Sequence, residues 1–268
     1  MKGLIDQMSL LGRSALITGG AGHIGRVIGE TLLELGAKVT ILDLDLEDCR
    51  RVCQSWSSSD YQTRSFPLAC NLSDEKETRA AVHTAKNMMG GVDILIHSAA
   101  FVGTTQFPGW AVPFQEQTVA AWEASFQVNL TAAFVLVQEA RSLLEASGTG
   151  SVVFLGSIYG MVGPDPGLYQ DTAMTTPAAY AASKGGLAQL TRYLATLLAP
   201  RIRVNSIMAG GVFRNQPSVF VDRYIRRTPL KRMAVEEDLQ GAVAYLAGSL
   251  SAYVTGVLLP VDGGWTAW

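Results

Sequence analysis

Ser14-Ala-Leu-Ile-Thr18 runs directly into Gly19-Gly-Ala-Gly-His-Ile-Gly25, and this junction decides the fold. The apolar run predicts a buried strand, the glycines predict a tight turn, and the residues after them predict an amphipathic helix. Glycines let the backbone approach a phosphate group closely, and the first turn of a helix offers free N–H groups and a partial positive charge. In this strand–turn–helix setting, the glycines predict a loop that holds a pyrophosphate.

Outward from this junction, short apolar runs alternate with amphipathic helical stretches. Continuous apolar runs are typical of strands buried on both faces, and strand–helix repetition implies a parallel sheet with right-handed crossovers. We therefore predict an α/β, Rossmann-type doubly wound fold, with about seven parallel strands flanked by helices on both faces, in a single domain over residues 1–268. The expected strands are 14–18, 38–43, 64–69, 93–97, 151–156, 202–207 and 257–261, and the expected helices are 23–36, 75–89, 119–146, 178–199 and 236–248.

Length and composition restrict the class of protein. The 268 residues suit one large α/β domain, and 48% hydrophobic against 16% charged residues implies a deep core. A net charge of −2 gives no electrostatic reason to expect a nucleic-acid partner. The N-terminal residues lack the apolar core of a signal peptide, and no apolar run approaches the ~18 residues of a membrane span, so we expect a cytoplasmic protein without a membrane partner. Cys49, Cys53 and Cys70 are expected to be buried thiols, and no metal site is expected.

Asp43 closes the second expected strand, 24 residues beyond Gly19. A carboxylate at this spacing from the glycine loop accepts hydrogen bonds from the adenosine ribose hydroxyls and repels a 2′-phosphate. Leu44 and Asp45 follow it, where an arginine would favour the phosphate. The sequence therefore predicts NAD in preference to NADP, although a solvated aspartate at a strand end would give the same pattern.

Tyr180 and Lys184 stand four residues apart in Ala-Tyr-Ala-Ala-Ser-Lys-Gly, and Ser157 lies upstream in Leu-Gly-Ser-Ile-Tyr. Positions i and i+4 share one helix face, so the ammonium group can lie beside the phenol. A nearby cation favours the phenolate, and we expect Lys184 to lower the Tyr180 pKa so that Tyr180 exchanges a proton with an alcohol. A serine hydroxyl placed alongside can hydrogen-bond the same substrate oxygen.

Together these motifs resemble the classical short-chain dehydrogenase/reductase family along essentially the whole chain. Val-Asn129-Leu, Arg203-Val-Asn205 and the closing Val261-Asp-Gly-Gly264 also match its pattern. The resemblance implies an NAD(P)-dependent oxidoreductase that interconverts a secondary alcohol and a ketone, with Asn129, Ser157, Tyr180 and Lys184 as its catalytic residues. The cofactor contacts that it implies are Gly19, Gly22, His23, Ile24, Gly25, Asp43, Asn71, Leu72, Ser98, Ala99, Tyr180, Lys184, Gly210 and Val212.

Several positions depart from the family's pattern. His23 stands where the classical loop has a glycine, as in the extended branch that holds sugar-nucleotide epimerases and dehydratases. His97-Ser-Ala-Ala100 replaces the usual Asn-Asn-Ala-Gly, and Arg214 stands in place of a threonine, where it meets the cofactor, an anionic substrate or only solvent. Two alternatives therefore stay open beside the dehydrogenase: an epimerase or dehydratase that recycles its bound NAD, and a non-catalytic NAD-binding scaffold.

Three expected loops, at about 101–118, 158–177 and 211–233, would border the substrate. Loop 158–177 is longer than its counterpart in the family and rich in hydroxyl and carboxylate groups. It predicts a polyol substrate, because each unpaired buried partner would cost about 1–3 kcal/mol. Loop 101–118 holds Trp110 and Phe114, which are expected to present a flat aromatic surface to a sugar. Both loops could instead simply pack the rim of an oligomer.

The C-terminal tail ends in Gly264-Trp-Thr-Ala-Trp268. With the first two substrate loops, it is similar to short-chain dehydrogenases of bacterial surface-glycan and nonulosonate pathways, which implies a sugar or sugar-derived substrate. Two tryptophans at a terminus would be unusual in water, and the family resemblance implies that the last strand and the tail lie at a subunit interface. A homotetramer is expected, with a dimer as the second possibility. The alternative is a tail folded onto its own subunit.

Overall fold

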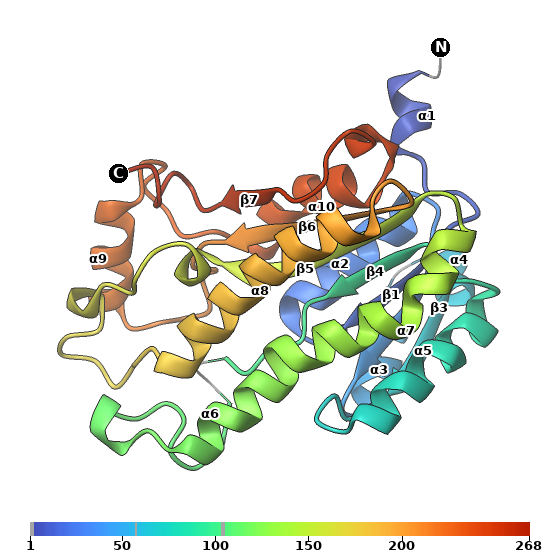
Figure 1. Cartoon of the computed structure of the whole chain (residues 1–268). Coiled ribbons are helices and arrows are strands. Elements are labelled where there is room, and N and C mark those ends of the chain that lie inside the picture. The colour runs from blue at the N-terminus through green and yellow to red at the C-terminus, as the bar shows by residue number, and fades with distance from the viewer. Residues whose placement is uncertain (1–2, 57, 103–104) are drawn as a thin grey trace.

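The computed structural model describes residues 3–56, 58–102 and 105–268, and a parallel sheet runs through its centre (Figure 1). The strands are β1 (Ser14–Thr18), β2 (Lys38–Asp43), β3 (Ser65–Ala69), β4 (Ile94–His97), β5 (Gly150–Ser157), β6 (Ile202–Ala209) and β7 (Leu258–Val261). They form one seven-stranded sheet in the order β3-β2-β1-β4-β5-β6-β7. The predicted Rossmann-type α/β fold is confirmed, and each expected strand lies within a few residues of its observed bounds.

The sheet reverses its strand order between β1 and β4, which are neighbours in space although β2 and β3 separate them along the chain. In the register of the sheet, Thr18 at the end of β1 lies opposite both Leu42 and His97. Open α/β sheets bind ligands beyond the carboxyl ends of the strands at such a reversal. The glycine loop begins directly after Thr18, so the fold places it at this crevice.

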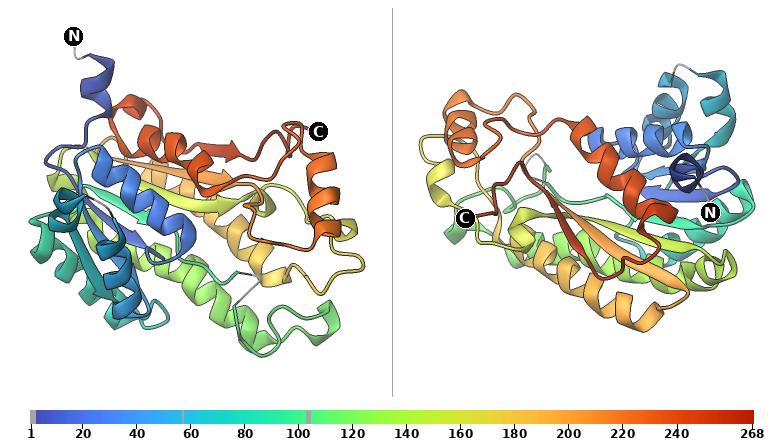
Figure 2. Two further views of the ribbon diagram at one scale, coloured as in Figure 1. Left: turned by 180° about the vertical axis from the view of Figure 1, so that it is seen from behind. Right: turned by 90° about the horizontal axis from the view of Figure 1, so that it is seen from above.

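Helices cover both faces of the sheet (Figures 1 and 2). α5 (Glu75–Met89), α7 (Ala132–Ala146) and α8 (Ala178–Leu198) cover one face, and α2 (His23–Glu34), α3 (Leu46–Ser55) and α10 (Gln240–Ala247) cover the other. α9 (Ser218–Arg227) stands beyond the carboxyl ends of the strands, next to the C-terminus. The shorter helices are α1 (Leu4–Met8), α4 (Ser59–Arg64) and α6 (Val119–Phe126).

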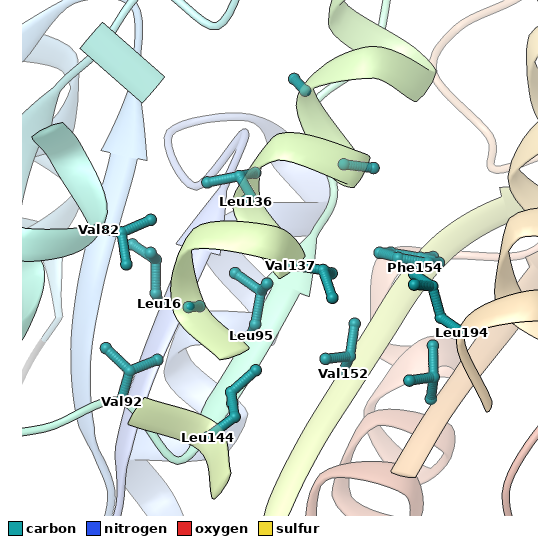
Figure 3. Close-up of a cluster of buried hydrophobic side chains, with 14 of the residues drawn as sticks. Leu16, Val82, Val92, Leu95, Leu136, Val137, Leu144, Val152, Phe154 and Leu194 are labelled. Atoms are coloured by element: carbon teal, nitrogen blue, oxygen red, sulfur yellow. The ribbon is translucent and has the colours of Figure 1, made fainter. Parts of the chain in front are cut away.

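The two faces of the sheet bury separate apolar clusters. In the cluster shown in Figure 3, side chains of the strands meet those of α5, α7 and α8; it includes Leu16, Val82, Val92, Leu95, Leu136, Val137, Leu144, Val152, Phe154 and Leu194. Burial of apolar surface stabilises a fold by about 25 cal/mol per Å², so these two clusters are the main stabilising contribution. Because the strands are covered on both sides, their sequences are continuous apolar runs.

The segment Val119–Ala146 has the length and hydropathy of a membrane-spanning helix. Its side chains on one face, Leu136 and Leu144 among them, are fully buried against the sheet in the cluster of Figure 3. It is therefore a core helix. The expected helix 119–146 is confirmed, and it contains a π-helical turn at Gln127–Thr131 that joins α6 to α7. In that turn the Ala132 N–H bonds to the carbonyl of Gln127, five residues back.

The sequence missed four short helices, α1, α3, α4 and α9. In α3 only Cys49 and Cys53 are buried, so the apolar pattern on which the helix prediction rests is too sparse there. The sequence did contain a helix-capping residue for α3. The Asp45 carboxylate accepts hydrogen bonds from the N–H groups of Glu47 and Asp48, which marks the start of the helix.

Candidate active site

A cavity of about 910 Å³ opens beyond the carboxyl ends of the central strands. The glycine loop borders one end of it, and aromatic side chains of the loop after β5 and of α9 border the other. Apart from Asn129, every residue predicted to bind the cofactor or to take part in catalysis lines this single cavity: Gly19, Gly22, His23, Ile24, Gly25, Asp43, Asn71, Leu72, Ser98, Ala99, Ser157, Tyr180, Lys184, Gly210 and Val212.

Two glycines of the loop are required by close backbone contacts. Gly19 has a φ of +65°, and a Cβ there would stand 2.6 Å from the backbone nitrogen of Ala99. A Cβ on Gly25 would stand only 2.0 Å from the Gly19 carbonyl oxygen, so α2 can meet the turn only at a glycine. Gly22 precedes the first turn of α2 and is exposed to the cavity, as is His23. The free N–H groups of that turn and the lack of a side chain at Gly22 fit a pyrophosphate.

Asp43 lies at the end of β2, beside the glycine loop. One oxygen of its carboxylate accepts a hydrogen bond from the Ala21 N–H at 3.0 Å, and the other accepts from the Leu44 N–H at 2.8 Å. These bonds fix the carboxylate on the wall of the cavity without neutralising its charge. Its remaining lone pairs can accept hydrogen bonds from ribose hydroxyls.

Ser157, Tyr180 and Lys184 lie together in the wall of the cavity. Ser157 ends β5, and the other two lie one helical turn apart on α8, with the Lys184 ammonium nitrogen 5.8 Å from the centre of the Tyr180 ring. Burial raises the pKa of the Tyr180 phenol above its ordinary value, while a hydrogen bond with Ser157 acts in the opposite direction. The rise is contrary to the lowering expected from the sequence.

The reason is the burial of the phenol itself, and Lys184 is buried beside it. Its ammonium group is buried and donates a hydrogen bond to the Leu155 carbonyl at 2.7 Å. Burial disfavours its charged form and lowers its pKa to about 8. The same burial therefore disfavours the charged form of both side chains, the phenolate of Tyr180 and the ammonium of Lys184.

Asn129 lies in the π-helical turn and is completely buried, so its side chain does not reach the cavity. Its amide oxygen accepts a hydrogen bond from the Phe101 N–H at 2.7 Å, and its amide nitrogen donates to the Ser183 hydroxyl at 2.9 Å. The Ser183 hydroxyl in turn donates to the Tyr180 carbonyl. The Asn129 side chain therefore ties the π turn to the first turns of α8, which carry Tyr180 and Lys184.

His97, at the end of β4, is also completely buried. Its Nδ1 lies 2.8 Å from the hydroxyl of Thr18, which also receives a long hydrogen bond from the Ala99 N–H. Burial lowers the His97 pKa to about 3, so the ring is neutral at physiological pH. This histidine joins β1 to β4 at the point where the strand order reverses, which is a structural role.

Four aromatic residues and a methionine from the expected substrate loops 158–177 and 211–233 form the wall of the cavity beside the reacting residues. Tyr159, Tyr169, Phe220, Tyr224 and Met233 line it. The hydroxyls of Tyr159 and Tyr169 are 2.7 Å apart, and the Tyr224 hydroxyl accepts a hydrogen bond from the Gly211 N–H at 2.6 Å. Phe220 and Tyr224 come from the apolar face of α9, a helix that was not predicted. The sequence placed this segment in the expected substrate loop 211–233 but did not single out the two residues.

Of the polar groups in loop 158–177, the Tyr159 and Tyr169 hydroxyls lie at the cavity as the sequence predicted, whereas the acidic groups do not. The Asp165 carboxylate is 2.8 Å from the Arg227 guanidinium, and Asp171 is 3.0 Å from Arg223. The Thr172 hydroxyl donates to the Tyr169 carbonyl. These groups bind the loop to α9 and to itself, so they do not form a polyol-binding wall.

The aromatic surface expected from loop 101–118 is also different. Trp110 is buried, donates a hydrogen bond from its indole nitrogen to the Val102 carbonyl, and packs edge-on against Phe101. Phe114 is 75% exposed and does not line the cavity. The face of Trp110 is therefore closed to a ligand. Residues 103–104 of this loop lie outside the described residues.

The C-terminal tail folds onto its own subunit. Trp265 is buried, stacks on Tyr224 with 6.1 Å between ring centres, and lies under the Arg227 guanidinium at 4.3 Å. Trp268 is exposed, and its indole nitrogen donates to the Arg227 carbonyl. Trp265 is therefore covered by α9 of its own subunit, while the placement of the last strand and the tail at a subunit interface stays a prediction. Arg214, at the cavity rim, pairs with Glu236 at 3.0 Å.

Comparisons with known proteins agree with this geometry. Residues 19–266 match the family model described as enoyl-(acyl carrier protein) reductase. A tropinone reductase homolog of Arabidopsis thaliana is 32% identical over 265 residues, which cover 96% of this chain and 94% of that protein. The cis-4-hydroxycyclohexanecarboxylate dehydrogenase of Sinomonas cyclohexanicum is 30% identical over 262 residues, or 95% of this chain and 97% of that protein.

Two solved structures superpose closely on the chain. A short chain dehydrogenase from Leptospira borgpetersenii with bound NAD+ has a TM-score of 0.83 and 34% identity, over 99% of this chain and 96% of that chain. The RhlG/NADP active-site complex from Pseudomonas aeruginosa has a TM-score of 0.83 and 29% identity, over 97% and 98% of the two chains. Similar proteins therefore bind either of the two nicotinamide cofactors.

Proposed function

The chain belongs to the classical short-chain dehydrogenase/reductase family, and from that premise we propose that it oxidises the secondary alcohol of a small ring compound, or reduces the matching ketone. It is an NAD(P)-dependent oxidoreductase that acts on CH–OH groups. The observation that supports the ring substrate is the apolar and aromatic wall next to Ser157 and Tyr180, which Ile158, Phe220 and Met233 contribute. One relative of the chain acts, by its name, on a hydroxylated six-membered ring.

In the proposed mechanism, a bound nicotinamide cofactor supplies the hydride chemistry. Tyr180 exchanges the proton of the reacting oxygen, and Ser157 donates a hydrogen bond to that oxygen as charge develops on it. Burial keeps the Tyr180 phenol protonated, which is the state that donates a proton to a ketone. Oxidation needs the phenolate, and the Lys184 ammonium is the nearby charge that can stabilise it. Asn129 holds the π turn against α8 and so orients Tyr180 and Lys184.

The glycine loop and the neighbouring strand ends would hold the cofactor. We assign the pyrophosphate to Gly19, Gly22, Gly25 and the first turn of α2 with His23 and Ile24; the ribose to Asp43; the adenine side to Asn71, Leu72, Ser98 and Ala99; and the nicotinamide side to Tyr180, Lys184, Gly210 and Val212. The Asp43 carboxylate would repel a 2′-phosphate, so we propose NAD as the preferred cofactor. One solved relative binds NAD+ and another binds NADP, so both cofactors are compared in the experiment below.

A sugar or sugar-derived substrate is the second candidate. The observation in its favour is the pair of tyrosine hydroxyls of Tyr159 and Tyr169 at the far end of the cavity. The remaining polar groups of loop 158–177 are engaged with α9, which leaves few partners for a molecule with many hydroxyls. The relatives described above give no support for a glycan pathway, nor for an epimerase that recycles its NAD.

We further propose a homotetramer. Apolar side chains are exposed on the helices that cover one face of the sheet: Val119, Trp122, Phe134, Tyr193 and Leu197. Exposed large apolar side chains on these helices are typical of an association surface. The three cysteines are unpaired and buried, as is typical of a protein in the reducing cytoplasm. We treat the whole chain as one domain, with loops 101–118, 158–177 and 211–233 as the substrate border.

The first experiment is reduction of NAD or NADP, followed at 340 nm with the purified protein. The panel contains cyclohexanols, cyclohexanediols, open-chain secondary alcohols, sugars and sugar phosphates, and the reverse reaction is run with the matching ketones. We expect turnover of the ring alcohols, with NAD giving the higher kcat/KM. Turnover restricted to sugars would replace the ring proposal. Loss of a sugar substrate without net reduction of the cofactor would replace the dehydrogenase with the recycling epimerase.

Tyr180→Phe is the matched variant for that experiment. The exchange removes only the hydroxyl that moves the proton, so we expect kcat to fall at least about a hundredfold. The ring that packs beside Lys184 remains, and binding of NAD(P)H, measured by calorimetry, should change by less than about threefold. Full activity in this variant would contradict the assigned role of Tyr180.

A further inference from the structure

Two tyrosine hydroxyls form a polar spot in the far wall of the cavity. Tyr159 and Tyr169 both line the cavity, and their hydroxyl oxygens are 2.7 Å apart. Tyr159 follows closely after Ser157, whose hydroxyl accepts a hydrogen bond from the Tyr159 N–H at 3.2 Å. The backbone that fixes the reacting end of the site therefore also fixes this pair.

The surroundings of the pair are apolar. The Tyr169 ring packs on Phe220 with 5.4 Å between centres, and the Tyr159 ring meets Trp265 edge-on at 6.4 Å. Ile158 and Leu168 are buried in the same cluster. Both rings are thus held in place by packing, so their hydroxyls have little freedom to turn toward solvent.

The pair has hydrogen-bonding capacity that the protein leaves unused. Two hydroxyls carry two protons, and the bond between them uses one. In the described part of the chain, no other group bonds to either hydroxyl oxygen. One donor and several lone pairs are therefore available to a ligand. In an apolar pocket, such groups discriminate strongly between a ligand that pairs with them and one that does not.

The pair also lies within electrostatic reach of the reacting phenol, because Tyr169 contributes to the raised pKa of Tyr180. A small ring whose hydroxyl lies at Ser157 and Tyr180 would point its opposite side toward the pair. The nearby arginines are already engaged: Arg214 with Glu236, Arg223 with Asp171 and Arg227 with Asp165. This end of the cavity therefore favours an uncharged oxygen over a carboxylate.

We propose that the Tyr159–Tyr169 hydroxyl pair binds a second, uncharged oxygen of the substrate, across the ring from the reacting carbon. The preferred substrate class is then a cyclic diol or the matching hydroxyketone. This inference rests on the ring-alcohol function proposed above and narrows it. It assigns Tyr159 and Tyr169 as specificity-determining residues that take no part in the proton or hydride transfer.

The test compares 1,4-cyclohexanediol with 4-methylcyclohexanol, in which a methyl group of similar size replaces the second hydroxyl. We expect the wild-type protein to favour the diol in kcat/KM by about tenfold. Tyr169→Phe and Tyr159→Phe should each reduce that preference about three- to tenfold, mainly through the KM of the diol. The double variant should lose little more than the larger single effect, because the two hydroxyls act as one unit.

Tyr224→Phe is the comparison variant, since its hydroxyl also lies in the cavity wall but accepts the Gly211 N–H. It should change both substrates alike and leave their ratio as in the wild type. Equal losses on both substrates in Tyr169→Phe and Tyr159→Phe, or an unchanged ratio, would overturn the inference and leave the ring-alcohol function standing. If neither ring alcohol reacts with NAD or NADP, the inference and the proposed function both fail.

Discussion

At some positions of the glycine loop, only the hydrogen atom of a glycine fits where other residues carry a Cβ. Gly25 and Gly22 belong to the same loop and differ sharply in this respect. A Cβ at Gly25 would overlap the Gly19 carbonyl at 2.0 Å, whereas at Gly22 the nearest atom would be 3.3 Å away. The first site requires glycine for the fold itself, and the second keeps a surface free for a ligand.

We therefore expect Gly25→Ala to destabilise the protein and to abolish cofactor binding, because the turn and α2 must separate to admit the methyl group. The expected loss is at least about 2 kcal/mol of unfolding free energy. Gly22→Ala is the matched control, with a melting temperature near that of the wild type. Denaturant unfolding and NAD titration of the two variants test this difference. Equal stability of the two variants would refute it.

The second prediction at this scale concerns Lys184. Its pKa falls from 10.5 to about 8 on burial, which corresponds to a cost of about 3 kcal/mol while the ammonium is charged in the folded state. Below about pH 8 that cost is present in full. As the pH rises from about 8 to 10.5, the folded protein has lost the proton and the unfolded chain still holds it, so stability should increase.

Lys184→Met removes the buried charge and keeps the length of the side chain. At pH 7 and without cofactor, the variant should be more stable than the wild type by about 1–3 kcal/mol, after allowing for the lost hydrogen bond to Leu155. Its turnover should be severely reduced. Between pH 7 and 10, the unfolding free energies of the variant and the wild type should converge, because the wild type gains stability as the pH rises. A variant less stable than the wild type at pH 7 would show that the charge is compensated.

At the scale of elements, three separate segments meet on the Arg227 side chain. It pairs with Asp165 in loop 158–177 and lies over Trp265 in the tail, while its own helix α9 carries Phe220 and Tyr224 into the cavity wall. The cation–π contact and the ion pair together orient α9 over the carboxyl end of the sheet. The position of the substrate wall therefore depends on contacts outside the cavity.

We predict that Arg227→Met raises KM for the alcohol about three- to tenfold, because α9 loses both anchors. Cofactor affinity should stay within about twofold, since the glycine loop lies at the other end of the cavity. Arg226→Met is the control: the same exchange at an exposed neighbour on α9. Steady-state kinetics with both variants give the answer, and equal KM values would remove the anchoring role.

At the scale of the whole molecule, the exposed apolar face of α6, α7 and α8 predicts assembly. Phe134 is 44% exposed and Leu197 is 52% exposed, although both side chains are large and apolar. Replacing both with Asp should shift a tetramer to dimers or monomers, because charges would have to be desolvated at the interface. Light scattering after size exclusion measures the mass. Leu11→Asp, at a still more exposed apolar site that precedes β1, should leave it unchanged. A wild-type monomer would refute the tetramer.

Much of the site was already encoded in local sequence. The glycine loop, Asp43 and the Tyr180–Lys184 pair could be read from spacing, because a turn, a strand end and one helix face are all short-range features. The strand bounds followed for the same reason, since strands buried on both faces are continuous apolar runs. The helix 119–146 was predicted without its π turn, in which Asn129 contacts the distant Ser183.

The sequence by itself determined the strands, the glycine turn and the placing of Tyr180 and Lys184 on one helix face, because each depends on neighbours within a few positions. Only the tertiary structure decided what the substrate meets. It turned the acidic groups of loop 158–177 toward the arginines of α9, buried Trp110 and Trp265, and left the Tyr159–Tyr169 pair facing the cavity. It also reversed the expected shift of the Tyr180 pKa. Burial and pairing between distant segments set these outcomes, and neither can be read from spacing along the chain.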